Sequence, residues 1–273
     1  MPVVNAARSN LAGTEGFGRT PWYGLDITSS LQNEWRVVRT EANWFAIEVL
    51  YAAAISFYPT LITFRCEAGF TYAPGEEFPS GVVSWIGVGF PGDGPGLPSD
   101  PDQNVAISGL APLGLTVAQI ISNPSLAFAG DDIITGGTGM LLMMSDEIYA
   151  GDGNDTVVGA DTDGRFDLGR GNGSVNGGGG VDFARVDFSD RTAAVTYVHS
   201  DTQAIASVGG QAAVTVQNIE SVEIIGGSGY DQITGGAAND IIDLFTGGGL
   251  ANGGDGWDTV RLDFSNEARS VTY

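Results

Sequence analysis

Residues Ala150 to Val158 read A-G-D-G-N-D-T-V-V. Glycine stands at places 2 and 4 of this nine-residue unit, aspartate at place 6 and an apolar residue at place 8. The same frame continues without a break to Arg185. A fixed period of this kind predicts a solenoid, in which each unit is too small to bury a core alone and stacks on its neighbours.

Further units lie on both sides of this stretch. Upstream, the frame extends back to residue 127, with one unit interrupted by Met140–Met144, which we expect to form an irregular loop. This makes six units in residues 127–185. Four more run through residues 226–261, of which the third, 244–252, is degenerate.

A longer period is superimposed on the short one. Asp155 matches Asp231 and Asp182 matches Asp258, each at a spacing of 76 residues (231 − 155 and 258 − 182). Residues 195–197 and 271–273 both read V-T-Y, at the same spacing. Because the second copy reaches only to residue 273, we expect the chain to be a fragment of a longer protein with further modules.

The nine-residue frame has a direct physical explanation. A glycine-rich turn needs positive φ and close backbone approach, and the three residues that follow form a short strand whose place-8 side chain points inward. Stacking would bring place-6 carboxylates to about 4.8 Å from each other. Two such charges repel by roughly 3–4 kcal/mol at an effective dielectric near 20, so a cation is needed between them. Calcium fits best, because it accepts six to eight oxygen ligands in flexible geometry.

The composition agrees with a cation as partner. The chain has 33 acids against 11 bases, a formal net charge of −22, and 42 glycines. This charge excludes a nucleic-acid binder and argues against docking on anionic lipid. The longest apolar run, Val49 to Phe64, is broken by Pro59 and too short to span a membrane. The first residues lack the apolar core of a signal peptide, so we expect any export to proceed without an N-terminal signal.

Residues 1–126 form a different region that is typical of β structure. β-Branched and aromatic residues cluster with Gly, Pro or Asn between them, which predicts strands at 35–39, 43–49, 61–64 and 82–88. A Gly- and Pro-rich loop is expected at 89–104 and one short helix at 116–121. We expect an antiparallel, sandwich-like β domain with Cys66 buried in it. The single histidine, His199, is expected on the surface of the region between the repeat blocks.

The repeats resemble the RTX (repeats-in-toxin) family of secreted bacterial calcium-binding proteins, whose nonapeptide is G-G-x-G-x-D-x-U-x. The resemblance covers residues 127–273. It implies a parallel β-roll in which two nonapeptides make one coil, so that unit n pairs with unit n+2 and calcium lies between turns on the same side. It also implies an extracellular location reached by type I secretion. The expected architecture is all-β, with four segments: an N-terminal β domain (1–126), a first roll (127–185), an inter-repeat β segment (186–225) and a second block (226–273).

The pairing rule selects the best calcium sites. It places Asp132 next to Asp155 and Asp240 next to Asp258, whereas other place-6 aspartates face glycine. We therefore expect substitution of Asp155 to weaken calcium-induced folding more than substitution of Asp182. The full set of expected calcium ligands is Gly130, Asp132, Asp146, Gly151, Gly153, Asp155, Asp163, Asp182, Gly227, Gly229, Asp231, Asp240, Asp255 and Asp258.

Other interpretations stay open. The repeat aspartates could form turns without any metal. The first half, residues 1–126, could be an enzyme of an unrecognised class, although we expect no catalytic function because the chain has neither a His-Glu-x-x-His nor a G-x-S-x-G motif. The protein could also be an adhesin or surface-layer component whose partner is an extracellular surface or polysaccharide.

Overall fold

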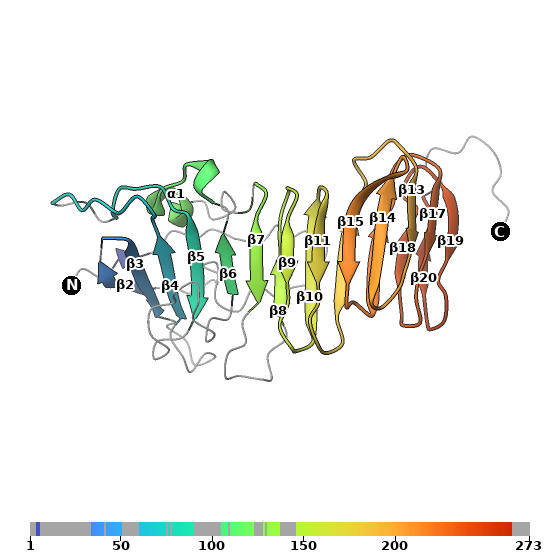
Figure 1. Cartoon of the computed structure of the whole chain (residues 1–273), viewed down its shortest axis with the longest axis horizontal. Coiled ribbons are helices and arrows are strands. Elements are labelled where there is room, and N and C mark those ends of the chain that lie inside the picture. Colours follow the sequence, from blue (N-terminus) through green and yellow to red (C-terminus); the bar gives the residue numbers. More distant parts are fainter. Residues whose placement is uncertain are drawn as a thin grey trace. The chain divides into compact units, whose positions relative to one another are not determined.

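The computed structural model of the chain (Figure 1) describes residues 4–5, 34–40, 42–50, 60–74, 76, 78–89, 105–108, 110–122, 128, 130–136 and 146–263. Two compact units are present, residues 1–142 and 143–273. The protein is all-β, as the sequence predicts. The Met140–Met144 insertion, residues 90–104 of the expected loop and the 271–273 match lie outside the described residues.

The first unit is one antiparallel sheet among its described residues, with each strand paired to the next along the chain. All four predicted strands are confirmed within a few residues, as β2, β3, β4 and β5. A second, facing sheet, which a sandwich requires, is not among the described residues of this unit. The strands are β1 (Val4–Asn5), β2 (Glu34–Thr40), β3 (Trp44–Leu50), β4 (Thr60–Arg65), β5 (Trp85–Gly89), β6 (Val105–Ser108) and β7 (Ile133–Gly136).

A short helix lies between β6 and β7 along the chain. The predicted helix is confirmed as α1 (Val117–Ser122), preceded by a 3-10 turn, η1 (Ala111–Leu113). Thr116 caps α1, because its Oγ1 accepts the Gln119 N–H at 3.3 Å while Gln119 Oε1 accepts the Thr116 N–H at 2.9 Å. Val117 is buried, and so is Cys66 near the end of β4, as predicted. No helix in the described part of the chain is long and apolar enough to cross a membrane.

The second unit contains two sheets. One is fully parallel, in the order β20-β18-β16-β12-β10-β8, and the other runs β9-β11-β15-β14-β13-β17-β19 (Figure 1). The strands are β8 (Asp146–Tyr149), β9 (Thr156–Val158), β10 (Gly164–Arg170), β11 (Gly173–Asn176), β12 (Phe183–Asp187), β13 (Val195–Val198), β14 (Gln203–Val208), β15 (Gln211–Gln217), β16 (Ser221–Ile225), β17 (Asp231–Thr234), β18 (Ile241–Asp243), β19 (Gly249–Asn252) and β20 (Thr259–Arg261).

Consecutive nonapeptides alternate between these two sheets. Strands that pair within a repeat block are 18 residues apart, which is two units: Gly164 of β10 lies opposite Asp146 of β8, and Gly249 of β19 lies opposite Asp231 of β17. The pairing of unit n with unit n+2 is therefore confirmed in the described strands. Place-8 side chains of the nonapeptide strands from β8 to β18 are buried in both sheets, including Val157, Phe166, Val175, Ile233 and Ile242.

The segment between the two repeat blocks inserts three strands into one sheet and one strand into the other. β13, β14 and β15 form an antiparallel group between β11 and β17, whereas in the parallel sheet β12 pairs directly with β16. The prediction that His199 lies on the surface is wrong. Along β13 every second side chain points inward, and His199 continues that alternation after Val195 and Tyr197, with its Nδ1 2.7 Å from the Tyr197 hydroxyl.

Candidate functional site

The glycine-rich turns stack directly on one another. Gly151 and Gly153, at places 2 and 4, have φ of 94° and 158°, and the first of these lies in the left-handed region that favours glycine. A Cβ atom on Gly169 would lie 1.7 Å from the Gly151 carbonyl oxygen, and one on Gly171 would lie 1.6 Å from that of Gly153. Glycine is therefore required at these places, because each turn lies against the turn two units before it.

Four of the place-6 aspartates in the second unit are buried rather than exposed to solvent: Asp155, Asp182, Asp231 and Asp240. Burial of a carboxylate is costly unless hydrogen bonds or a cation compensate the charge. The contacts of Asp231 and Asp240 show how the chain meets part of this cost.

Asp231 accepts backbone hydrogen bonds with both carboxylate oxygens. Its Oδ2 accepts the N–H of Gly227, in the same turn, at 2.9 Å, and its Oδ1 accepts the N–H of Val195, at the start of β13, at 2.8 Å. Burial raises the pKa of Asp231 above 3.8, although these two hydrogen bonds act in the opposite direction. The charged form is therefore only partly stabilised by the protein itself.

Asp240 makes the same pair of contacts and adds a third. Its Oδ2 accepts the Gly236 N–H at 2.6 Å and its Oδ1 accepts the Val222 N–H at 2.8 Å. Its own N–H donates to Oδ1 of Asp258 at 2.9 Å. The predicted neighbours Asp240 and Asp258 thus lie next to each other, and each carboxylate joins its own turn to the coil beside it.

The donor set of these turns fits calcium. Each carboxylate oxygen that accepts one amide hydrogen keeps a further lone pair, and the stacked turns supply carbonyl oxygens close by. Within the described residues there is no group of three or more His, Cys, Asp and Glu side chains that could hold a metal ion. Calcium does not require such a group, since backbone carbonyls complete its oxygen shell.

Of the other predicted calcium ligands, two aspartates are exposed and two residues belong to the first unit. Asp163 is exposed, and its Oδ1 accepts the Val181 N–H at 2.8 Å. Asp255 is also exposed, and its backbone N–H donates to the Gly236 carbonyl at 2.9 Å. Gly130 and the buried Asp132 belong to the first unit. The predicted Asp132/Asp155 pair would join the two units and stays a prediction.

Place 5 carries contacts that sequence reasoning missed. The side-chain oxygen of Asn154 accepts the N–H of Asn172 at 2.9 Å, and that of Asn239 accepts the N–H of Trp257 at 2.8 Å. With Asp163 and Val181, this gives three links between residues 18 apart. The signal was present in the sequence, because Asn or Asp recurs at place 5 and an oxygen acceptor at that place is the shared property.

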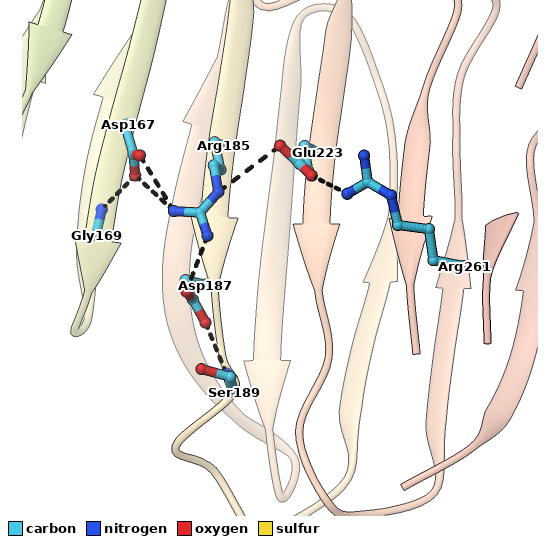
Figure 2. Close-up of polar contacts among 7 residues, drawn as sticks. All are labelled: Asp167, Gly169, Arg185, Asp187, Ser189, Glu223 and Arg261. Carbon is cyan, nitrogen blue, oxygen red and sulfur yellow. Dashed lines mark hydrogen bonds and ion pairs between the residues drawn. The ribbon is translucent and has the colours of Figure 1, made fainter. Parts of the chain in front are cut away.

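An ion-pair network, drawn in Figure 2, crosses the parallel sheet. The Arg185 guanidinium on β12 contacts Asp167 on β10 at 3.1 Å, Asp187 at 3.0 Å and Glu223 on β16 at 3.7 Å. Arg261 on β20 contacts the same Glu223 from the other side. Burial raises the pKa of Asp167 despite the neighbouring Arg185. Arg185 therefore compensates three carboxylates without any metal ion.

Place-9 side chains close the turns that follow the strands. Asp167 Oδ1 accepts the Gly169 N–H at 2.9 Å, and Asp243 Oδ1 accepts the Phe245 N–H at 2.8 Å. Asn176 makes the corresponding contact to Gly178 at 3.2 Å. These are Asx turns, in which a short side chain bonds to the backbone two residues later.

In comparisons with protein-family models, curated proteins and solved structures, no match to this chain was found.

Proposed function

We propose that this chain is a secreted calcium-binding protein of the RTX type, whose repeat region closes into a parallel β-roll when calcium binds outside the cell. The observation that carries the proposal is the set of place-6 aspartates Asp231, Asp240 and Asp258, of which Asp231 lies in one sheet and the other two lie at the strands of the parallel sheet. Within this set, two carboxylates are buried and Asp240 lies directly beside Asp258. The reasoning rests on charge and donor type, together with the resemblance of the repeats to the RTX nonapeptide.

The residues that would hold calcium are the place-6 carboxylates together with the carbonyls of the glycine turns. Asp240 and Asp258 are the favoured pair, because each can offer an oxygen between adjacent coils. Asp155 and Asp231 are the next candidates, since each is buried and faces a glycine, Gly173 and Gly249, on the neighbouring coil. A bound divalent ion would neutralise the repulsion between carboxylates and replace the water that burial removes.

Coupled folding would follow from this arrangement. At low calcium, the second unit carries an excess of uncompensated aspartates, which favours an open chain that is fit for export. At the millimolar calcium of extracellular fluid, sites with dissociation constants of about 10⁻⁴–10⁻³ M would fill and close the repeats. The binding energy then becomes folding energy.

Circular dichroism of the full chain during a calcium titration tests the proposal, with magnesium as the ion control. We expect β structure to increase near millimolar calcium and to stay unchanged with magnesium. Asp240→Asn should shift the midpoint to about tenfold higher calcium or abolish the transition. Asp163→Asn is the matched control, because Asp163 is an exposed repeat aspartate whose acceptor oxygen is retained in asparagine.

Two results would contradict the proposal. Full β structure in chelator, unaffected by calcium, would assign the aspartates to turn formation alone. Equal shifts in Asp240→Asn and Asp163→Asn would show that the buried place-6 carboxylates have no special role in the calcium response.

A further inference from the structure

Among the described residues, which end at 263, the edge strands β19 and β20 have no further strand beside them and form the open end of the second repeat block. Val260 and Leu262, whose positions correspond to buried core positions 76 residues earlier, are 44% and 47% exposed. Their counterparts Ala184 and Val186 are 0% and 1% exposed. The same two positions of the repeat are therefore buried in the first block and exposed in the second.

The first block shows what covers this type of surface. Ala184 lies opposite Val222, and Val186 lies opposite Ile224, in the pairing of β12 with β16. In the other sheet, Val175 of β11 lies opposite Val216 of β15 in the same way. All of the covering side chains are buried. The cover of the first block is thus the inter-repeat segment of this same chain.

Charged residues of the second block correspond to those that contact the inter-repeat segment in the first block. In the first block the Asp182 N–H donates to Glu220 Oε2 at 2.7 Å, and Arg185, with 14% of its side chain exposed, contacts Glu223. The counterpart of Arg185 is Arg261, whose side chain is 50% exposed. A further copy of the segment would bring a second Glu223-like carboxylate to this arginine.

We propose that the open end formed by β19 and β20 is a docking surface for a β segment with the sequence pattern of residues 198–225. Residues 263–265 repeat the D-F-S of 187–189, so the chain leaves β20 with the same sequence that leads from β12 into the first cover. An uncovered pair of edge strands otherwise exposes apolar side chains and backbone groups that can pair with other chains. The inference goes beyond calcium binding and concerns the second block in its folded state.

The test appends a copy of residues 198–225 after Tyr273 of the full chain. The comparison proteins are the unextended chain and a chain that carries the same appended residues in scrambled order, all in calcium-containing buffer. Amide hydrogen exchange is measured at Gly253, because its counterpart Gly177 donates its N–H to the Gln217 carbonyl at 3.0 Å. We expect exchange at Gly253 to slow by about tenfold or more only with the ordered copy.

A second variant keeps the test decisive if the appended segment changes solubility. Val260→Asp should remove the added protection in the extended chain, whereas in the unextended chain, where Val260 is half-exposed, it should change exchange at Gly253 by less than about twofold. Equal exchange with ordered and scrambled copies would overturn the proposal. It would also be overturned if the unextended chain were a dimer in solution with Gly253 already protected, because the surface would then be an interface between two copies.

Discussion

The two repeat blocks share one nine-residue frame but connect their coils differently. In residues 150–185, place 6 is aspartate in the first and last units, as Asp155 and Asp182, and glycine in the two units between them. In residues 226–261, three aspartates occupy place 6. The first block relies more on place-5 links and on Arg185, whereas the second relies on its place-6 carboxylates.

One pair of matched positions explains part of this difference. Gly164 of the first block corresponds to Asp240 of the second, and Phe166 corresponds to Ile242. A Cβ on Gly164 would lie 2.3 Å from Cζ of Phe166, so the aromatic ring occupies the space that an aspartate needs. The first block thus has an aromatic ring at the place where the second block has a place-6 carboxylate. If the repeats bind calcium as proposed, the second block should depend more on calcium than the first, where packing replaces one place-6 carboxylate.

The largest effect is expected at Arg185. Replacing it by methionine would leave Asp167, Asp187 and Glu223 close together without their shared cation. Breaking a buried ion pair in this way costs about 3–5 kcal/mol of unfolding free energy. Urea unfolding in calcium measures the change. Arg165→Met is the matched control, because the Arg165 guanidinium, 4.8 Å from the Phe183 ring centroid, should contribute about 1 kcal/mol or less.

A loss near 1 kcal/mol for both arginine variants would contradict the importance of the network, and the first block would then be held mainly by its core and its place-5 links.

The next largest effect on stability is expected when Gly164 and Phe166 of the first block are replaced by the residues of the second block. Gly164→Asp alone should destabilise the chain by about 1–3 kcal/mol or more, because the new side chain meets the Phe166 ring. Adding Phe166→Ile should recover part of the loss in calcium but not in chelator, since the double variant recreates the second-block arrangement. Thermal unfolding with and without calcium separates these cases. Equal recovery in both buffers would show that only space, and not charge, distinguishes the blocks.

A smaller effect is expected at place 5. Asn239→Ala and Asn154→Ala each remove one acceptor for an inter-coil N–H and should cost about 0.5–1.5 kcal/mol. Asn239→Asp should retain most of the stability, because Asp163 already performs this role in the native sequence. Urea unfolding is again the measurement. If alanine and aspartate at position 239 were equally destabilising, the acceptor oxygen would not be the cause.

The smallest effect is a dependence on pH that calcium reverses. Burial raises the pKa of Asp231 and of Asp167 in the folded chain. A carboxyl with a raised folded-state pKa binds more protons in the folded than in the unfolded state. Its contribution to stability is therefore fully present below 3.8 and is lost as pH rises through the folded-state value. In chelator, mild acid should raise the thermal midpoint of the repeat region.

With calcium bound, protons compete with the metal for the same oxygens, so mild acid should instead lower the midpoint. Asp231→Asn should reduce the acid gain that is measured in chelator. If the acid-induced gain that depends on Asp231 were the same in both buffers, the calcium ligands would not include Asp231.

Much of the repeat region could be predicted from the sequence, because the nine-residue period, together with the pairing of unit n with unit n+2 that the RTX resemblance implies, fixes which residues meet. The 18-residue register of Asp231 with Gly249 follows from counting, and so does the Asp240–Asp258 contact. Four strands of the first unit, β2 to β5, were also predictable from their β-branched and aromatic residues, whereas β1 and β6 were not predicted. The calcium ligation itself remains a prediction from charge and donor type.

Other features depend on geometry that the period does not contain. Glu223 reaches Arg185 only because β16 takes the place beside β12 after the β13–β15 group is inserted in the other sheet. The burial of His199 likewise depends on the side-chain alternation of β13 continuing just past the last residue of the strand, Val198. The place-5 links could have been found, because their Asn and Asp residues recur at a fixed place in the frame.

Hydrogen exchange of the full chain, read by mass spectrometry separately for residues 150–185 and 226–261, tests the central claim most directly. The account predicts that calcium protects both blocks and that the second gains more, because three aspartates occupy its place 6 against two in residues 150–185, and because it has the open end. In chelator, the segment around Arg185 should keep the most protection. Full and equal protection of both blocks in chelator, with no change on adding calcium, would contradict the account.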